Sequence, residues 1–269
     1  MKILVASLIR DRAWILPDFL RNIRVLEVPE GVEVEYYFLV DNSTDKSFEI
    51  TYNTVIGKDI EKPLWGAAVV AYNTEESEQD PRGYYARVKS GTYTHLQKLR
   101  EKLRLIAVEG KYDYLLVVDC DILVEPDLLC RLLDDKKDFV AATISNDAQG
   151  AFTSVNALDL RCKRLNNPYA RPPRLVAHQY VGDRLVEVGV TGACYLIRKE
   201  VLKKCSYFFE PTAQEDSLIK SSFGEDVWFA ISCAREGFTQ WLDESVTAFH
   251  AHTQEFFERR FGKRGKAGK

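Results

Sequence analysis

Short apolar runs alternate with amphipathic helical patterns along the first half of the chain. The predicted strands cover residues 2–8, 34–40, 67–72, 113–118 and 138–144. Helices are predicted between them, at about 14–25, at about 84–108 and from Pro126 onward. Strands separated by helices favour a layered α/β fold around a mostly parallel sheet that is buried on both faces. Ligands bind such sheets beyond the carboxyl ends of the strands, so polar residues at those ends are the first candidates for a site.

The second half of the chain is less regular. It contains predicted strands near 186–190 and 193–198, a predicted helix at about 225–236 and a predicted strand at about 244–249. The last residues, 259–269, are basic and contain glycine, so we expect them to be frayed. We find no internal repeat and no low-complexity linker that would divide the chain.

The composition excludes several classes of protein. The chain is 46% hydrophobic and 29% charged, which is typical of a globular protein and excludes a wholly disordered one. Its 37 Lys and Arg residues against 40 Asp and Glu residues argue against a globally basic protein that binds nucleic acid. No stretch is long and apolar enough to span a bilayer, and the N-terminal apolar run stops at Arg10 without a signal-peptide cleavage site.

The cysteine pattern indicates the compartment. No two of the six cysteines are spaced as C-x-x-C, and most lie inside apolar runs. Buried free thiols in a reducing cytosol are therefore favoured over zinc sites or disulfides. We expect a cytoplasmic protein, whose contact with the inner face of the membrane is at most peripheral and made through the basic tail.

Asp119-Cys120-Asp121 comes directly after the apolar strand at 113–118. In an extended segment, residues i and i+2 point to the same side, so the two carboxylates repel each other unless a cation lies between them. Hard oxygen ligands suit Mg²⁺ or Mn²⁺, and such an ion can bridge the pair to a diphosphate. A solvated loop is the alternative, but the pair ends a buried strand, where charge is costly without a role.

A second acidic pair, Glu225 and Asp226, follows Gly224 and begins a predicted helix. Acidic residues favour helix N-termini through the helix dipole, so a purely structural role is the simpler interpretation. The chain also carries the pair Asp119-Cys120-Asp121, a D-x-D motif. Beside it, two adjacent carboxylates nevertheless indicate a general base, which would take the proton from an attacking hydroxyl.

Three further sets of polar residues are candidates. His250 and His252 follow the last predicted strand, and imidazole is a common metal ligand, although a structural role is also compatible with their position. Asp41 ends the second strand, where its carboxylate either accepts hydrogen bonds from a base or ribose or takes part in a turn. Arg87 lies at the start of the long predicted helix, where it would either contact phosphate or face solvent.

In this order the motifs resemble those of a GT-A glycosyltransferase of the family-two type, over about residues 1–252. The stretches that carry the resemblance are Val40–Asp45, Tyr112–Pro126 with its D-x-D motif, Gly189–Leu202, Gly224–Val227 with Arg235–Phe238, and His250. The resemblance implies a Rossmann-like, mostly parallel central sheet flanked by helices, with a smaller mixed sheet in the acceptor half. It also implies one domain over 1–254, divided into a nucleotide-binding half (1–125) and an acceptor and catalytic half (126–254), followed by a basic tail over 255–269.

The same resemblance implies an activity. It implies a nucleotide-diphospho-sugar donor linked to UDP or GDP, Mn²⁺ or Mg²⁺ as the cofactor, and transfer of a hexose to a hydroxyl of a carbohydrate, lipid-linked or small-molecule acceptor, with inversion. Asp226 is implied as the catalytic base with Glu225 as the second candidate. The metal ligands are implied to be Asp121, Asp119 and one or both of His250 and His252. The residues implied to contact the donor or acceptor are Ser7, Arg10, Asp41, Arg87, Asp119, Gly192 and Trp228.

Two alternatives stay open beside this interpretation. A sugar-nucleotidyltransferase normally has a glycine-rich phosphate loop near its N-terminus, and residues 1–12 contain no glycine. A non-catalytic nucleotide-sugar-binding protein is less favoured because the chain keeps both the metal and the base candidates. The first loop also departs from the family pattern, which more often has a proline there. The sequence indicates neither the sugar, nor the acceptor, nor the oligomeric state.

Overall fold

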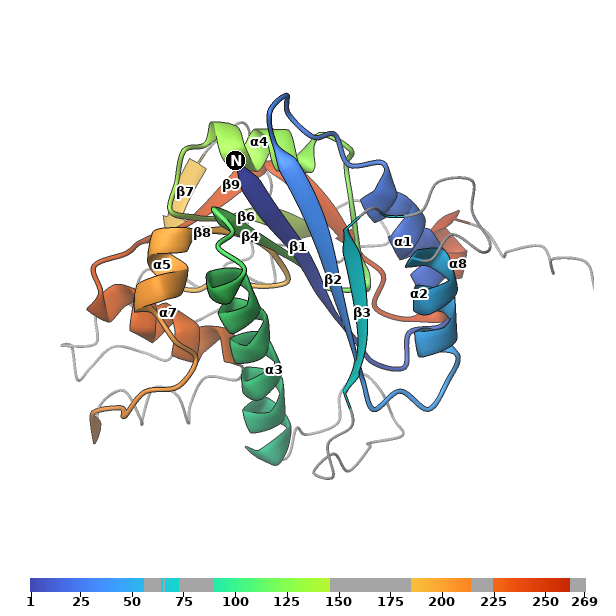
Figure 1. Ribbon diagram of the computed structural model, residues 1–269, viewed down its shortest axis with the longest axis horizontal. Coiled ribbons are helices and arrows are strands. Elements are labelled where there is room, and N and C mark those ends of the chain that lie inside the picture. Colours follow the sequence, from blue (N-terminus) through green and yellow to red (C-terminus); the bar gives the residue numbers. More distant parts are fainter. Residues whose placement is uncertain (56–63, 65, 73–89, 146–184, 214–224, 262–269) are drawn as a thin grey trace, which may run out of the picture.

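The computed structural model describes residues 1–55, 64, 66–72, 90–145, 185–213 and 225–261, which form an α/β structure (Figure 1). Its strands are β1 (Lys2–Ile9), β2 (Glu33–Asp41), β3 (Ala67–Tyr72), β4 (Tyr114–Val118), β5 (Ile122–Val124), β6 (Phe139–Ser145), β7 (Leu185–Val188), β8 (Cys194–Arg198) and β9 (Gln240–His250). Its helices are α1 (Leu16–Arg24), α2 (Ser47–Val55), α3 (Ser90–Glu109), α4 (Leu128–Asp134), α5 (Lys199–Lys204), α7 (Glu225–Arg235) and α8 (Gln254–Phe261). All the strands predicted from the sequence are present.

The strands pair into one sheet in the order β3-β2-β1-β4-β8-β6-β9-β5, with β7 also paired to β9. The first four strands of this order are parallel to one another. β8 is antiparallel to both of its neighbours, β4 and β6, while β6 and β9 are parallel. The expected mostly parallel sheet flanked by helices is therefore confirmed. The expectation of a smaller second sheet is wrong in one respect, because the strands of the second half continue the central sheet.

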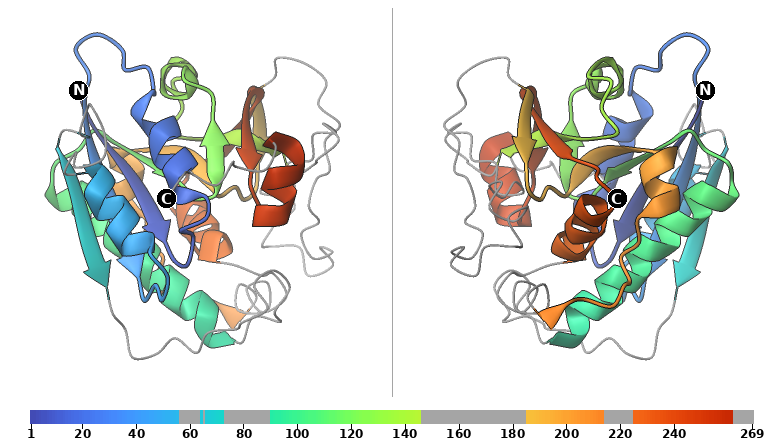
Figure 2. Two further views of the ribbon diagram at one scale, coloured as in Figure 1. Left: turned by 90° about the vertical axis from the view of Figure 1, so that its right-hand side faces the viewer. Right: turned by 90° about the vertical axis from the view of Figure 1, so that its left-hand side faces the viewer.

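The sheet is buried on both faces because apolar residues fill both sides of its strands. In β1, Ile3 and Val5 face one core, which α1 and α4 cover, while Leu4 and Ala6 face the other, which α3 and α5 cover. Successive side chains of a strand point to opposite faces, so a run without polar residues places one row in each core. Figure 2 shows helices on both sides of the sheet.

The position of α1 could be predicted because its buried residues recur at helical spacing in the sequence. Leu16, Phe19, Leu20 and Ile23 recur at helical spacing, and all four are buried. Pro17 lies in the first turn, where the backbone N–H that proline lacks has no helical partner in any case. The predicted helix at 14–25 is confirmed.

Three helices, α2, α5 and α8, were not expected from the sequence. In α2 the buried positions include Ser47, Thr51 and Thr54, so the helix has no apolar stripe to reveal it. In α8, Phe257 is buried against Ile15, which fixes the helix to the body of the fold. The assignment of residues 255–261 to a tail is therefore wrong, and residues 262–269 lie outside the described part of the chain.

Two expectations from the composition can be compared with the structure. In the described ranges, no helix is long and apolar enough to cross a membrane. The cysteines there are free, and four of them are buried: Cys120, Cys194, Cys205 and Cys233. Cys130 is partly buried, and Cys162 lies outside the described residues.

Candidate active site

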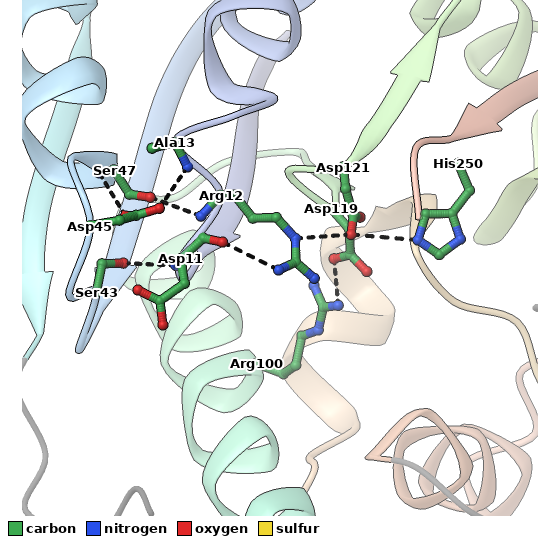
Figure 3. Close-up of polar contacts among 10 residues, drawn as sticks. All are labelled: Asp11, Arg12, Ala13, Ser43, Asp45, Ser47, Arg100, Asp119, Asp121 and His250. Atoms are coloured by element: carbon green, nitrogen blue, oxygen red, sulfur yellow. Dashed lines mark hydrogen bonds and ion pairs between the residues drawn. The ribbon is translucent and has the colours of Figure 1, made fainter. Parts of the chain in front are cut away.

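Three parallel strands bring their carboxyl ends to one edge of the sheet. β1 pairs with β2 on one side, in a register that places Ile9 opposite Val40, and with β4 on the other. The segments that follow these strands therefore meet: the loop after Ile9, Asp41 at the end of β2, and Asp119 after β4. Figure 3 shows the polar contacts among residues of this edge. The sequence prediction of a polar site at the strand ends is consistent with this arrangement.

The loop after β1 is tied to the start of α2. The backbone N–H of Arg12 donates to Oγ of Ser47 over 2.9 Å, and the backbone N–H of Ala13 donates to Oδ2 of Asp45 over 2.9 Å. Oδ1 of Asp45 in turn accepts from the backbone N–H of Ser47 over 2.9 Å, so the carboxylate joins both segments (Figure 3). The polar cluster after Asp41 therefore provides turn contacts that fix the position of Arg12.

Asp119 and Asp121 contact different partners. Ile122 donates its backbone N–H to the carbonyl of Asp119 over 2.9 Å, so the D-x-D segment is a tight turn between β4 and β5 and not the extended segment that we expected. Oδ1 of Asp119 accepts a hydrogen bond of 2.5 Å from Nη2 of Arg100 on α3. The two carboxylates are not bare charges that repel each other, as we expected, because each already lies beside a cationic side chain (Figure 3).

Arg100 connects the two acidic motifs. Its side chain is 4% exposed, and besides Asp119 its Nε lies 3.5 Å from Oε1 of Glu225 at the start of α7. Burial opposes its charge, but the surrounding carboxylates, Asp119 first among them, raise the pKa of Arg100 well above its usual value. A guanidinium between two carboxylates satisfies charges that would otherwise be costly to bury.

Asp121 lies between Arg12 and His250. Its Oδ2 is 3.3 Å from Nε of Arg12 and 3.5 Å from Nε2 of His250 (Figure 3). Burial alone would raise the pKa of Asp121, but the contacts with His250 and Arg12 outweigh it and lower the pKa to about 2. Asp121 is therefore a carboxylate at any physiological pH, which is the form that binds a cation.

The four expected metal ligands are only partly brought together. Asp121 and His250 are adjacent, and the rings of His250 and His252 have centroids 3.7 Å apart. Burial and the neighbouring His250 lower the pKa of His252 to about 4, so its ring is neutral near pH 7, as a metal ligand must be. Asp119 is bound to Arg100. Among the described residues, no group of three or more His, Cys, Asp or Glu side chains is arranged to surround a metal ion.

The donor chemistry of this corner nevertheless fits the expected ion. A carboxylate oxygen of Asp121 lies 3.5 Å from an imidazole nitrogen of His250, and Mn²⁺ accepts both kinds of ligand. Two protein ligands leave the remaining positions of the ion to a diphosphate and water, which is the usual arrangement where a metal binds a phosphorylated substrate.

Asp226, of the second acidic pair, lies against a tight turn before β8. Ala193 has a positive φ of 64°, its carbonyl accepts the backbone N–H of Asp119 over 2.8 Å, and Gly192 precedes it. A Cβ on Gly192 would lie 2.2 Å from Oδ2 of Asp226. The absence of a side chain at this position therefore makes room for the Asp226 carboxylate beside the D-x-D turn.

Glu225 and Asp226 differ in their surroundings. Glu225 is 5% exposed and contacts Arg100, and burial raises its pKa. Burial, and then the negative charge of Glu225, raise the pKa of Asp226 well above its usual range. A carboxylate with a raised pKa is suited to accept a proton near neutral pH. The two residues therefore differ: Glu225 is the partner of Arg100, and Asp226 is the carboxylate whose pKa lies well above its usual range.

The other expected contact residues lie in different places. Asp41 is 1% exposed, with its Oδ2 2.8 Å from Nε2 of His95 and 3.6 Å from Nη1 of Arg10. Ser7 is fully buried within β1. Trp228, two residues after Asp226 on α7, packs against Phe209 with ring centroids 5.1 Å apart.

Three residues of the site were not singled out from the sequence: Arg12, His95 and Arg100. His95 and Arg100 are both buried on α3, and Arg100 lies between Leu99 and Leu103 of its apolar stripe. The sequence signal that could have found His95 and Arg100 is their position beside the buried apolar stripe of a predicted helix. Arg87, which we expected near the pyrophosphate, lies outside the described residues.

Comparisons with known proteins identify the family and the fold. A model of the N-terminal domain of glycosyltransferase family 25 matches residues 1–247. The structure is similar to that of S. aureus TarS 1–349 in complex with UDP-GlcNAc, with a TM-score of 0.52 and 13% identity over 96% of this chain and 64% of that chain. It is also similar to GalNAc-T7 with UDP, GalNAc and Mn²⁺, with a TM-score of 0.54 and 13% identity over 93% of this chain and 44% of that chain. At such identities the likeness shows the fold.

The chain spans less than two thirds of the length of these structures. A sequence search of curated proteins found no match.

Proposed function

The chain belongs to glycosyltransferase family 25 and is a glycosyltransferase of the GT-A fold, and on this premise we propose that it transfers a sugar from a nucleotide-diphosphate sugar to an acceptor hydroxyl with the help of a divalent metal and with inversion. The expected GT-A class is confirmed by these matches. The donor, the metal and the stereochemical course belong to the proposal.

The contacts of Arg100 support this function most strongly. Arg100 contacts both Asp119, in the turn after β4, and Glu225, next to Asp226 on α7. A single buried side chain thus connects the D-x-D turn to the helix that carries the candidate base. Transfer needs these two functions within reach of the same sugar carbon.

The donor would bind across the ends of β1, β2 and β4. Asp41 would contact the base, with Arg10 beside it, and Asp119 would contact the ribose or the metal. Ser7 is buried below this edge, so its part would be to support the loop. The complexes of TarS with UDP-GlcNAc and of GalNAc-T7 with UDP support a nucleotide-sugar donor for this fold.

Asp121 and His250 would hold Mn²⁺ or Mg²⁺, with His252 and Asp119 as neighbouring donors. A metal bound there neutralises the negative charge that develops on the departing nucleoside diphosphate. Arg12, beside Asp121, supplies a further positive charge at the same corner. The Mn²⁺ in GalNAc-T7 supports a metal in this fold.

Asp226 would act as the general base. Its carboxylate accepts the proton of the acceptor hydroxyl while the oxygen of that hydroxyl forms a bond to the anomeric carbon. The bond from that carbon to the diphosphate breaks as the new bond forms on the opposite face. Gly192 leaves the space that the carboxylate needs, and Glu225, bound to Arg100, keeps the base in a negative environment that raises its pKa.

The acceptor would be a carbohydrate, a lipid-linked sugar or a small molecule, because the general base requires only a hydroxyl. Trp228 packs against Phe209 near the start of α7, so it would contribute an aromatic surface on the acceptor side. We propose a cytoplasmic protein without a nucleic-acid partner, whose contact with a membrane is at most peripheral.

A release assay tests this function. The purified protein is incubated with UDP- and GDP-linked sugars and Mn²⁺, and free nucleoside diphosphate is measured with and without a panel of sugar acceptors. We expect release from one donor, stimulated by an acceptor, and a large loss in Asp226→Asn. Absence of release from every donor, or equal release by Asp226→Asn, would contradict the proposal.

A further inference from the structure

A buried hydrogen bond joins α3 to the end of β2, where the carboxyl ends of the parallel strands lie. Nε2 of His95 lies 2.8 Å from Oδ2 of Asp41, and the side chains are 7% and 2% exposed. An ionised carboxylate only accepts hydrogen bonds, so the ring presents Nε2–H to it. The contact links residues that are 54 positions apart in the chain, and thus fixes the carboxylate from a different element.

The pair leaves one polar atom of each partner without a hydrogen bond. Within the described structure, neither Oδ1 of Asp41 nor Nδ1 of His95 has a partner, and both are buried. Burying a polar group without a hydrogen bond costs free energy, and a partly satisfied network is worse than an apolar contact. If the pair only joined α3 to β2, apolar side chains of similar size would do so at a lower cost in free energy.

Two side chains beside Asp41 determine which of its carboxylate oxygens stays without a hydrogen bond. His95 and Arg10 both approach Oδ2, at 2.8 and 3.6 Å, so the carboxylate cannot turn without losing both contacts. Oδ1 is thereby left as the free acceptor. Because Asp41 is 1% exposed, a ligand reaches Oδ1 only when a neighbour moves, and Arg10 is the more exposed of the two partners at 29%.

We propose that His95 is a positioning residue for base recognition: it holds Asp41 so that Oδ1 accepts a ring N–H of the donor's nucleobase. The inference rests on the proposed function, since it concerns the donor that this function requires. It also limits the donor class. Uracil, thymine and guanine carry a ring N–H on their pairing edge, whereas cytosine presents a lone pair there that a carboxylate oxygen repels. UDP-, dTDP- or GDP-linked sugars are therefore favoured over CDP-linked ones.

Binding measurements on two variants of His95 test this role. Dissociation constants for UDP, GDP, dTDP, CDP and inorganic pyrophosphate are measured by calorimetry with Mn²⁺ present. In His95→Leu, we expect affinity for the preferred nucleotide to fall about tenfold, because a charge-assisted hydrogen bond has been removed. The differences in affinity among the four nucleotides should also become smaller. Affinity for pyrophosphate, which has no base, stays unchanged. His95→Gln keeps an N–H donor at a similar reach and restores most of the affinity and preference.

The outcomes separate this role from a purely structural one. If folded His95→Leu keeps the wild-type affinity and preference, or weakens pyrophosphate as much as the nucleotide, the inference is wrong. If His95→Leu does not fold, His95→Asn replaces it, because its shorter side chain cannot reach Oδ2 and the same loss is expected. A wild-type protein that binds pyrophosphate and all four nucleotides equally would overturn the inference and leave the transferase proposal standing. A wild-type protein that binds none of the five ligands would overturn both.

Discussion

Gly192 and Asp226 are in such close contact that a single methyl group does not fit between them. The Cβ of an alanine at 192 would lie 2.2 Å from Oδ2 and 2.8 Å from Cγ of Asp226. The turn before β8 and the first turn of α7 therefore define each other's position. The carboxylate that we assign as the base is placed by the absence of a side chain on another element.

Gly192→Ala tests this contact. We expect the variant to lose most of its transfer activity, because Asp226 must move, while its affinity for nucleoside diphosphates stays close to that of the wild type. The neighbouring Ala193→Gly is the matched control, since Ala193 has a positive φ of 64° that glycine adopts without strain. Equal kcat in Gly192→Ala and the wild type would show that the position of Asp226 is not critical.

Glu225→Gln is expected to shift the pH dependence of transfer. The negative charge of Glu225 raises the pKa of Asp226, and its removal leaves Arg100 with one fewer carboxylate partner, so the pKa of Asp226 falls. A general base is active above its pKa, so the acid limb of kcat/KM moves to lower pH. The profile is measured in wild type and variant over the same buffers. An unchanged limb, or one moved to higher pH, contradicts the assignment of Asp226.

Asp226→Asn is expected to make the protein more stable above neutral pH while removing its activity. The folded-state pKa of Asp226 is raised, so above that pKa the native protein carries a buried charge that the unfolded chain solvates freely. As the pH falls through the folded-state pKa toward the ordinary value, the native state takes up the proton and this cost disappears. The gain in Tm should therefore shrink as the pH is lowered. A variant less stable than the wild type at high pH would contradict the raised pKa.

Arg100→Met is expected to destabilise the fold strongly. The substitution leaves Asp119 and the buried Glu225 without their common cation, and breaking a buried ion pair in this way costs about 3 kcal/mol. Arg198→Met is the matched control, because Arg198 is half-exposed on the surface, where its ion pair with Asp138 contributes at most about 1 kcal/mol. Denaturant unfolding of the two variants gives the comparison. Similar losses of stability in both would show that Arg100 is not a central contact.

The sequence predicted the sheet better than the site. Apolar runs such as 113–118 become strands because burial on both faces requires them to be apolar throughout, so they stand out from their surroundings. The helix α2 could not be found in this way, since its buried residues include Ser47, Thr51 and Thr54. The helix α8 looked like a charged tail, because few of its residues, Phe257 among them, are buried.

The acidic motifs were found because their residue types are chemically distinctive, but their partners were not. That Arg100 contacts both Asp119 and Glu225 depends on how α3 and α7 cross the sheet edge, and no spacing in the chain encodes it. The D-x-D segment was also expected to be extended, whereas a backbone hydrogen bond from Ile122 to Asp119 makes it a turn. Long-range packing therefore decides which cation each carboxylate contacts.

We expect a nucleoside diphosphate and a metal to bind together at Asp121 and His250. A thermal-shift series with UDP, GDP, dTDP and CDP, each with and without Mn²⁺, tests it on the wild type and on Asp121→Asn. A ligand at about a hundred times its dissociation constant adds roughly 2.7 kcal/mol, which is readily measured. At least one diphosphate should stabilise the wild type with Mn²⁺ present, and Asp121→Asn should lose the part of this shift that depends on Mn²⁺. Stabilisation that is the same with and without Mn²⁺, or that Asp121→Asn retains in full, would contradict this expectation.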